Sequence, residues 1–361
     1  MTIDTRLWSD KAKSLTPYVP GEQPKHDHLV KLNTNENPFP PSPQAVAAMQ
    51  AVLADNASAL RLYPEPESDH LRDALADYYG LSRDEVFVGN GSDEVLALVF
   101  ACFFKKTRPL LMPDISYSFY PVYADTFGVD AQTVPLNDSF GIDIDDYDKP
   151  CDAIILANPN APTGKLLPLD DIRTLATRHP DAVVVIDEAY IDYADDVKAA
   201  SAIALIREFD NIVVTQTFSK SRALAGLRVG MAFANPSLIA ALMVMKNSFN
   251  SYPLDRVAQA GAAASVADRE YFERRRTEVI ELRHQLTADL VALGFDVLPS
   301  AANFVFATIA GQDAADIAAK LRSEGVIVRH FKQARIKDYL RISVGTAEQN
   351  VRLIEVLKQI L

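Results

Sequence analysis

The sequence predicts an α/β protein with a large domain, built on a mostly parallel sheet covered by helices, and a smaller α+β domain. Three observations support this prediction. At 361 residues the chain is longer than one ordinary core requires, which suggests about two domains. Between about residues 84 and 234, short apolar runs rich in Val and Ile alternate with stretches of helical length, as in parallel sheets buried on both faces. A shorter series of strands and helices follows near the C-terminus.

The elements are expected in three segments. Residues 1–45 are irregular and rich in proline, so we expect an arm that completes part of the small domain. Residues 46–285 are expected to form the large domain, whose strands are the runs EVFVGN (85–90), PLLMP (109–113), AIILANP (153–159), AVVVIDEAY (182–190), NIVVTQTFSK (211–220) and LRVGMAFA (227–234). Residues 254–291 have the pattern of one long amphipathic helix leading out of this domain. Residues 286–361 are expected to form the rest of the small domain.

Composition narrows the class of function. A formal net charge of −12 disfavours nucleic acid as a partner, because a polyphosphate backbone requires a basic face. No apolar stretch is long enough for a membrane span, and the first 15 residues lack the apolar segment of a secretion signal. Cys102 and Cys151 lie in apolar runs, which favours buried thiols over a disulfide. The six His residues lack metal-ligand spacing, so we expect a cytoplasmic protein without a metal site.

Two polar clusters follow the first and third of these strands. GNGSDE (89–94) opens a helix, and the free N–H groups around Ser92 and Asp93 at a helix N-terminus suit a phosphate. A simple helix cap explains the same residues. ANPNAPTGK (157–165) carries Asn158 and, taken alone, is typical of a turn.

Two further clusters contain residues suited to catalysis. VVVIDEAY (183–190) places Asp187 at the end of an apolar strand, but the phosphate loop that a nucleotide hydrolase requires is missing. TFSKSRALAGLRVG (217–230) places Lys220 beside Ser219, with Arg228 eight residues later. A lysine after a strand is normally a solvated charge, whereas these neighbours indicate an amine next to a bound phosphate.

The motifs NPNAPTG, DEAY and SKSRALAGLRVG, in this order, resemble the fold-type I pyridoxal-phosphate enzymes of the aspartate aminotransferase class. With LNTNENPFPPSP, LYPEPE, GSDE and LRISVGT, the chain is similar to the histidinol-phosphate aminotransferase subgroup from about residue 15 to the C-terminus. The resemblance implies a seven-stranded large sheet, pyridoxal 5′-phosphate as cofactor and a homodimer. It also implies transamination of L-histidinol phosphate with 2-oxoglutarate, giving imidazole-acetol phosphate and L-glutamate in histidine biosynthesis.

The resemblance also implies roles for individual residues. Lys220 would form the imine with the cofactor and move the proton, and Asp187 would pair with the pyridine nitrogen. Tyr190 and Asn158 would hydrogen-bond the 3′ oxygen of the ring. Tyr117 would stack on the ring, and this role is favoured even though an aromatic at helical spacing usually belongs to the core. The phosphate would be held by Ser92, Asp93, Ser219 and Arg228.

The substrate would be held by residues from both ends of the chain. Arg341 would bind the α-carboxylate through its guanidinium fork, and Arg329 the distal anion, unless Arg329 is a plain charge at a strand end. Tyr18, Asn158 and Tyr63 would line the pocket, with Tyr63 reaching in from the second subunit. The chain departs from the family pattern at Ala161, where Asn is common, and residues 330–338 have no clear match.

Three other functions compete with this interpretation. An aromatic amino-acid aminotransferase would use the same imine chemistry and Arg341. A pyridoxal-phosphate decarboxylase of a phosphorylated amino acid would release carbon dioxide without an oxo-acid acceptor. The sensor domain of a transcription regulator is disfavoured, because only about 30 irregular residues precede LNTNENP, too few for a basic helix-turn-helix.

Overall fold

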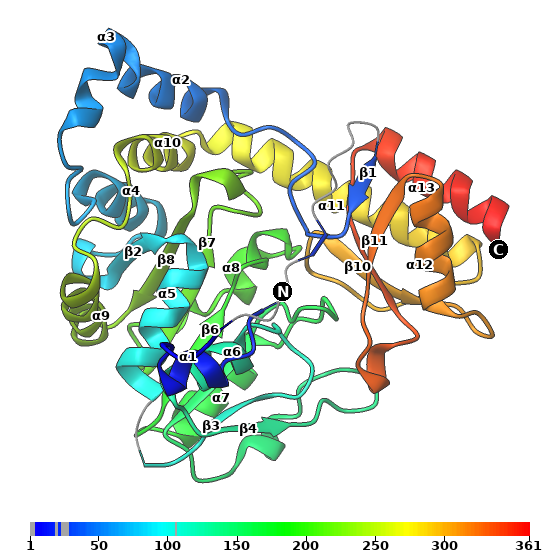
Figure 1. Ribbon diagram of the computed structural model, residues 1–361, viewed down its shortest axis with the longest axis horizontal. Coiled ribbons are helices and arrows are strands. Elements are labelled where there is room, and N and C mark those ends of the chain that lie inside the picture. Colours follow the sequence, from blue (N-terminus) through cyan, green and yellow to red (C-terminus); the bar gives the residue numbers. More distant parts are fainter. Residues whose placement is uncertain (1–3, 19–20, 23–28, 105–106) are drawn as a thin grey trace.

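The computed structural model describes residues 4–18, 21–22, 29–104 and 107–361. Two sheets organise these residues, one on the left and one on the right of Figure 1. The large sheet has seven strands in the order β2-β8-β7-β6-β5-β3-β4, and the small sheet has five in the order β1-β11-β12-β10-β9.

The large sheet confirms the predicted fold class. Strands β3 to β7 are parallel to their neighbours, and only β8 runs antiparallel, pairing with β7 and β2. The strand AQTV at residues 131–134 was missed by the sequence analysis, because it lies at the sheet edge and exposes its two middle residues. The strands are β2 (Val86–Asn90), β3 (Leu110–Pro113), β4 (Ala131–Val134), β5 (Ala153–Ala157), β6 (Val183–Asp187), β7 (Ile212–Thr217) and β8 (Val229–Ala234).

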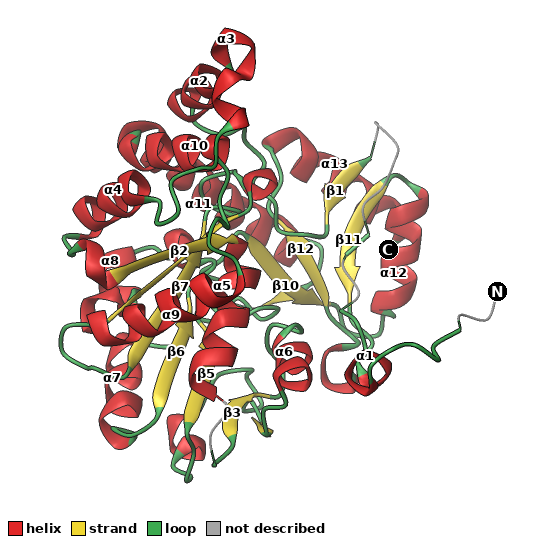
Figure 2. Cartoon of the chain, turned by 60° about the vertical axis from the view of Figure 1, so that its left-hand side comes forward, coloured by secondary structure: helices red, strands yellow, loops and turns green. Residues whose placement is uncertain are grey.

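Alternating side chains of the large sheet pack against helices on both faces, as Figure 2 shows. Along β6, Val184 and Ile186 belong to one buried cluster, and Val183 and Val185 belong to the other. The first cluster is covered by α4 (Asp69–Tyr79), α7 (Leu169–Arg178) and α10 (Arg256–Ala267). The second is covered by α5 (Gly91–Val99), α6 (Tyr120–Phe127) and α9 (Pro236–Phe249).

The prediction of one helix over residues 254–291 was wrong. The structure has two helices, α10 and α11 (Arg269–Ala292), separated by Asp268 with a non-helical ψ of 65°. The carboxylate of Asp268 accepts a hydrogen bond of 2.5 Å from Ser42, the residue that caps α2 (Pro43–Val52). Hydrophobic periodicity continues through this break, so it could not reveal a contact with a residue 226 positions away. Helix α11 connects the two sheets in Figure 1.

The small sheet joins both ends of the chain. Strand β1 (Val30–Leu32) pairs in parallel with β11 (Val326–His330), Val30 opposite Val326. The other strands are β9 (Asp296–Val297), β10 (Phe304–Thr308) and β12 (Leu340–Ser343), and they pack against α12 (Ala314–Ser323), α13 (Ala347–Ile360) and part of α11. The domain boundaries expected near residues 45 and 285 remain a prediction.

The remaining elements are short. They include α1 (Asp10–Ser14), α3 (Ala54–Ala57), α8 (Val197–Ala200) and a π-helical turn, η3 (Phe100–Phe104). The 3₁₀ turns are η1 (Ser58–Arg61), η2 (Arg83–Glu85), η4 (Ile144–Tyr147), η5 (Ile191–Tyr193), η6 (Ala202–Leu205), η7 (Ala225–Leu227) and η8 (Ala334–Ile336). Among the described residues, no helix has the length and apolar character needed to cross a membrane.

Candidate active site

A cavity of about 390 Å³ is lined by residues from both sheets. Its size suits a small molecule. The large sheet contributes residues at or just beyond the carboxyl ends of its parallel strands, where ligands bind in open α/β sheets. The lining includes all but two of the predicted site residues, namely Tyr18, Ser92, Asp93, Tyr117, Asp187, Tyr190, Ser219, Lys220, Arg228, Arg329 and Arg341.

Lys220 follows β7 and presents its amine to this cavity. Its Nζ donates a hydrogen bond of 3.2 Å to the carbonyl oxygen of Thr34 and lies 5.6 Å from the centre of the Tyr190 ring. Within the described part of the chain the amine makes no ion pair. It is therefore available to a carbonyl compound bound in the cavity.

Asp187 ends β6 as a buried carboxylate with fixed orientation. It accepts hydrogen bonds from the Tyr120 hydroxyl at 2.8 Å and from Thr215 Oγ1 at 3.1 Å. Burial raises the pKa of Asp187 to about 6, although these hydrogen bonds act in the opposite direction. A cationic partner in the cavity would favour the ionised carboxylate, so the site is suited to a ligand carrying a protonated nitrogen.

Arg228 and Asp93 form a second polar group in the cavity. Arg228 Nη2 lies 2.8 Å from Asp93 Oδ2, and its Nη1 lies 3.5 Å from Ser219 Oγ. The Tyr117 hydroxyl donates to Asp93 Oδ1 at 3.1 Å. A hydroxyl, a guanidinium and the first turn of α5 thus lie close together.

Glycine permits the close approach that builds this group. A Cβ atom on Gly230, in β8, would overlap the backbone of Gly91 and Ser92. Gly91 has a positive φ of 78°, and a Cβ atom there would overlap the guanidinium of Arg228. The N-terminus of α5 consequently lies against β8 beside Arg228, and free N–H groups next to an arginine make an anion site.

The small sheet contributes two arginines that face each other. Arg329 in β11 is the antiparallel partner of Arg341 in β12, so their side chains lie on the same face. Arg341 Nη2 donates to the carbonyl oxygen of Asn33 at 2.9 Å, whereas its buried Nε has no hydrogen-bond partner among the described residues. Burial also lowers the pKa of Arg341. An anion between the two guanidinium groups would relieve both their repulsion and the unpaired Nε.

Comparison with known proteins identifies the family. Residues 27–357 match the family described as class I and II aminotransferases. The chain belongs to that aminotransferase family. It is 64% identical over 361 residues to histidinol-phosphate aminotransferase 2 of Psychrobacter arcticus, covering 99% of this chain and 96% of the relative. It is 57% identical to histidinol-phosphate aminotransferase 1 of Pseudomonas fluorescens, covering 99% of this chain and all of the relative.

A solved aminotransferase has the same fold. The crystal structure of histidinol-phosphate aminotransferase from Sinorhizobium meliloti in complex with pyridoxal 5′-phosphate aligns with a TM-score of 0.87 at 25% identity. The alignment covers 99% of each chain. The likeness therefore extends over both sheets, including the elements that line the cavity.

Asn158 is one of two predicted site residues outside the lining of the aminotransferase cavity. Its buried amide pairs with the backbone of Leu167, which donates to Oδ1 at 2.8 Å and accepts from Nδ2 at 3.1 Å. These bonds position the loop after β5. Contact between Asn158 and a ring or substrate in the cavity stays a prediction.

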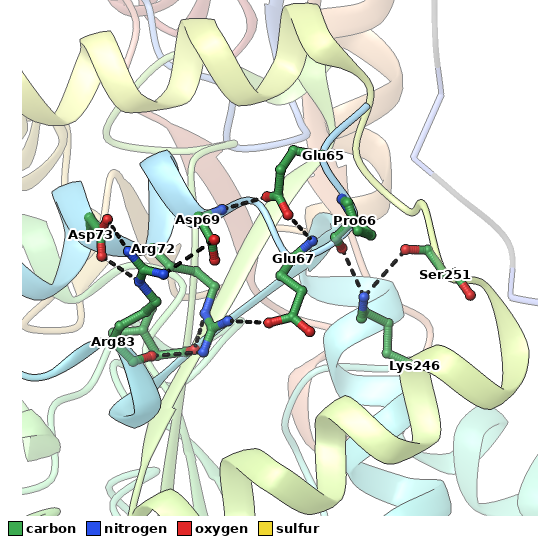
Figure 3. Close-up of polar contacts among 10 residues, drawn as sticks. Glu65, Pro66, Glu67, Asp69, Arg72, Asp73, Arg83, Lys246 and Ser251 are labelled. Carbon is green, nitrogen blue, oxygen red and sulfur yellow. Dashed lines mark hydrogen bonds and ion pairs between the residues drawn. The ribbon is translucent and has the colours of Figure 1, made fainter. Parts of the chain in front are cut away.

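Tyr63 is the second predicted site residue that does not line the cavity of its own chain. It is 77% exposed and stacks on Tyr252, with ring centroids 4.7 Å apart. The loop that follows is held by Gln259, which donates to the carbonyl oxygen of Glu65, and by Lys246, which donates to that of Pro66. Figure 3 shows Lys246 pointing at the Pro66 and Ser251 carbonyls.

Four polar residues at the site were missed by the sequence analysis. Asn35 donates to the Tyr190 hydroxyl at 3.0 Å and accepts from Ser343 Oγ at 3.0 Å, so it links Tyr190 to the small sheet. The polar run NTNEN, which contains Asn35 and Glu36, was a visible signal for both. Tyr120 and Thr215 gave no such signal, because a tyrosine in a helix and a threonine in a strand are common core residues.

Proposed function

We propose that this aminotransferase transfers the amino group of L-histidinol phosphate to 2-oxoglutarate, giving imidazole-acetol phosphate and L-glutamate in histidine biosynthesis. One observation carries the proposal: a single cavity holds the free amine of Lys220, the buried carboxylate of Asp187, an anion cradle at Arg228 and a second one at the arginine pair. The names of the relatives support the choice of substrate.

The residues fit pyridoxal 5′-phosphate. Its phosphate suits Arg228, Ser219 and the N-terminus of α5, where glycines leave room for a close approach. Its pyridine nitrogen suits Asp187, whose burial is costly without a cationic partner. The cofactor supplies an aldehyde that condenses with amines and a ring that accepts electrons from the substrate α-carbon.

Lys220 and Asp187 divide the chemistry between them. With the cofactor bound, the Lys220 amine would hold it covalently, and as a free amine it would move the proton to and from the substrate α-carbon. Asp187 keeps the proton on the pyridine nitrogen, and its hydrogen bonds from Tyr120 and Thr215 fix its orientation. The Tyr190 ring lies beside Lys220 and its hydroxyl is held by Asn35, so this hydroxyl would suit the 3′ oxygen of the ring.

The arginine pair must serve two substrates. In one half-reaction it binds the phosphate of L-histidinol phosphate, and in the other it binds a carboxylate of 2-oxoglutarate. Both anions match the fork of a guanidinium group, and Arg341 Nε has no hydrogen-bond partner among the described residues, which supports this role. Tyr18, in the N-terminal arm, also lines the cavity.

We further propose a homodimer in which Tyr63 completes the neighbouring cavity. Large apolar side chains are exposed near this loop, and a second copy would cover them; they are Leu60, Leu62, Tyr63, Phe249 and Tyr252. The tyrosine ring and its hydroxyl suit contact with a substrate phosphate at low entropic cost. The cytoplasmic location stays a prediction.

Steady-state assays test the reaction. With 2-oxoglutarate as acceptor, L-histidinol phosphate should give the highest kcat/KM among itself, phenylalanine and tyrosine, and no carbon dioxide should be released. A preference for phenylalanine or tyrosine would assign the aromatic aminotransferase function instead. Release of carbon dioxide without an acceptor would assign a decarboxylase.

A further inference from the structure

Three carboxylates line the cavity, and one of them has no part in the proposed chemistry. Asp93 is paired with Arg228, and Asp187 is buried against Tyr120 and Thr215. The third is Glu36, which follows β1 and lines the same cavity as Lys220 and the arginine pair. Its side chain is 45% exposed, so its carboxylate is accessible to a ligand.

Glu36 is held in a fixed orientation. Lys31 Nζ lies 2.7 Å from Oε1 and 2.5 Å from Oε2, and Thr34 Oγ1 donates to Oε2 at 2.9 Å. Burial acts to raise the pKa of Glu36, but the hydrogen bonds from Lys31 and Thr34 and the charges of Lys31 and Lys220 together outweigh it, so the pKa lies below its usual value. A carboxylate has about four acceptor positions, and these contacts use three, which leaves Oε1 able to accept one more hydrogen bond.

The substrate of the proposed reaction carries a group that needs such an acceptor. Its phosphate and amine are served by the arginine pair and the cofactor, but its imidazole presents an N–H that can only donate. Arginine and lysine side chains have no acceptor, and they repel the imidazolium form. L-Glutamate, which uses the same cavity in the other half-reaction, has no such ring.

We propose that Glu36 accepts a hydrogen bond from the substrate imidazole and thereby selects L-histidinol phosphate over amines with an apolar aromatic ring. This assignment rests on the proposed function. Lys31 and Thr34 act as positioning residues, because they orient the carboxylate. A phenyl ring in that place has no hydrogen-bond donor and would leave the open acceptor position of Oε1 unfilled, so the same residue disfavours phenylalanine.

The test compares two ligands that differ only in the ring. L-Histidinol phosphate and O-phosphoethanolamine share the amine and the phosphate, and only the first carries the imidazolylmethyl group. Their dissociation constants are measured by calorimetry on holoenzyme inactivated with borohydride, so that no turnover occurs. Glu36→Gln should raise the dissociation constant of L-histidinol phosphate about tenfold, as expected for one hydrogen bond to a charged group. The dissociation constant of O-phosphoethanolamine should change less than twofold.

Kinetics and a second variant separate recognition from folding. In active holoenzyme, Glu36→Gln should lower the ratio of kcat/KM for L-histidinol phosphate to that for phenylalanine by about tenfold. Lys31→Met keeps the carboxylate and removes its ion pair, so it should shift that ratio less than Glu36→Gln does. Equal losses for both ligands, or an unchanged ratio, would overturn the assignment of Glu36. If the wild-type holoenzyme does not convert L-histidinol phosphate, the proposed function fails first, whatever the variants do.

Discussion

Asp187 combines full burial with an ionisable carboxyl group, and this makes the stability of the cofactor-free protein depend on pH. Its folded-state pKa of about 6 lies above the ordinary value of 3.8. The folded state therefore binds the proton of Asp187 more tightly than the unfolded state does. This proton binding stabilises the fold fully below pH 3.8, and the stabilisation is lost as pH rises through about 6.

Asp187→Asn removes this dependence. In cofactor-free protein, the free energy of unfolding of the variant should rise relative to wild type by about 1–2 kcal/mol between pH 5 and pH 8. Urea titrations at the two pH values measure this change, and comparing them cancels the pH-independent cost of the substitution. If the difference in unfolding free energy between the two proteins stays constant with pH, the burial of an ionised carboxylate at this position is contradicted.

The same substitution should slow catalysis. An amide cannot stabilise a charged pyridine nitrogen, and such electrostatic contributions are commonly worth about 3–4 kcal/mol of barrier, roughly a hundredfold or more in rate. Stopped-flow measurement of the half-reaction with L-glutamate reports this step. Turnover of Asp187→Asn close to wild type would remove Asp187 from the mechanism.

Lys220 should be the residue that carries the cofactor. Holoenzyme should be yellow, and borohydride should fix the cofactor to Lys220, which mass spectrometry of the digested protein locates. Lys220→Ala should bind cofactor through its phosphate, lack the reducible bond and lose transamination. A reduced adduct on another lysine would assign the catalytic amine elsewhere.

At the scale of elements, the loop between η1 and α4 is held in part by one buried lysine in α9. Lys246 is 3% exposed and donates to the carbonyl oxygens of Pro66 and Ser251, at 2.8 and 3.3 Å. Burial lowers the pKa of Lys246. The ammonium group of Lys246 is the shared donor for both carbonyl oxygens, as Figure 3 shows.

Lys246→Met should loosen this loop without unfolding the protein. Loss of the donor should cost about 1 kcal/mol of unfolding free energy, because both carbonyls lie close enough to the surface to recover water. Hydrogen exchange followed by mass spectrometry should show faster exchange in residues 62–67. The control is Lys358→Met at an exposed lysine of α13, which should leave both measurements unchanged. Unchanged exchange in residues 62–67 of Lys246→Met would show that Lys246 does not hold the loop.

The elements differ in how far the sequence could predict them. Strands such as β6 and β7 were predicted because each begins with a run of Val and Ile, and the structure buries every residue of both strands. The break between α10 and α11 at Asp268 was not predicted, since it involves a hydrogen bond from Ser42 in a distant segment. At the site, motif residues such as Lys220 and Arg228 were recognisable, whereas the role of Tyr120 depends on its tertiary contact with Asp187, which no local motif reveals.

The whole molecule should function as a dimer. Sedimentation velocity should give the mass of two chains, because Tyr63 and its large apolar neighbours are exposed on the surface of one chain. Mixing inactive Tyr63→Ala and Lys220→Ala proteins under subunit exchange should restore activity toward half of wild type per mixed dimer. One site then carries both defects and the other neither. Verified exchange without recovery would place Tyr63 within its own subunit, provided that Tyr63→Ala alone is substantially impaired.

The parallel pairing of β1 with β11 has a consequence for how the protein is made on the ribosome. Val30 emerges roughly 300 residues before its partner Val326. At 5–20 residues per second, the first segment waits about 15–60 s before its partner strand is synthesised. The large sheet, complete by residue 234, can fold during this interval. The arginine pair lies on β11 and β12, so a nascent chain cannot complete the cavity until both of these strands have been translated.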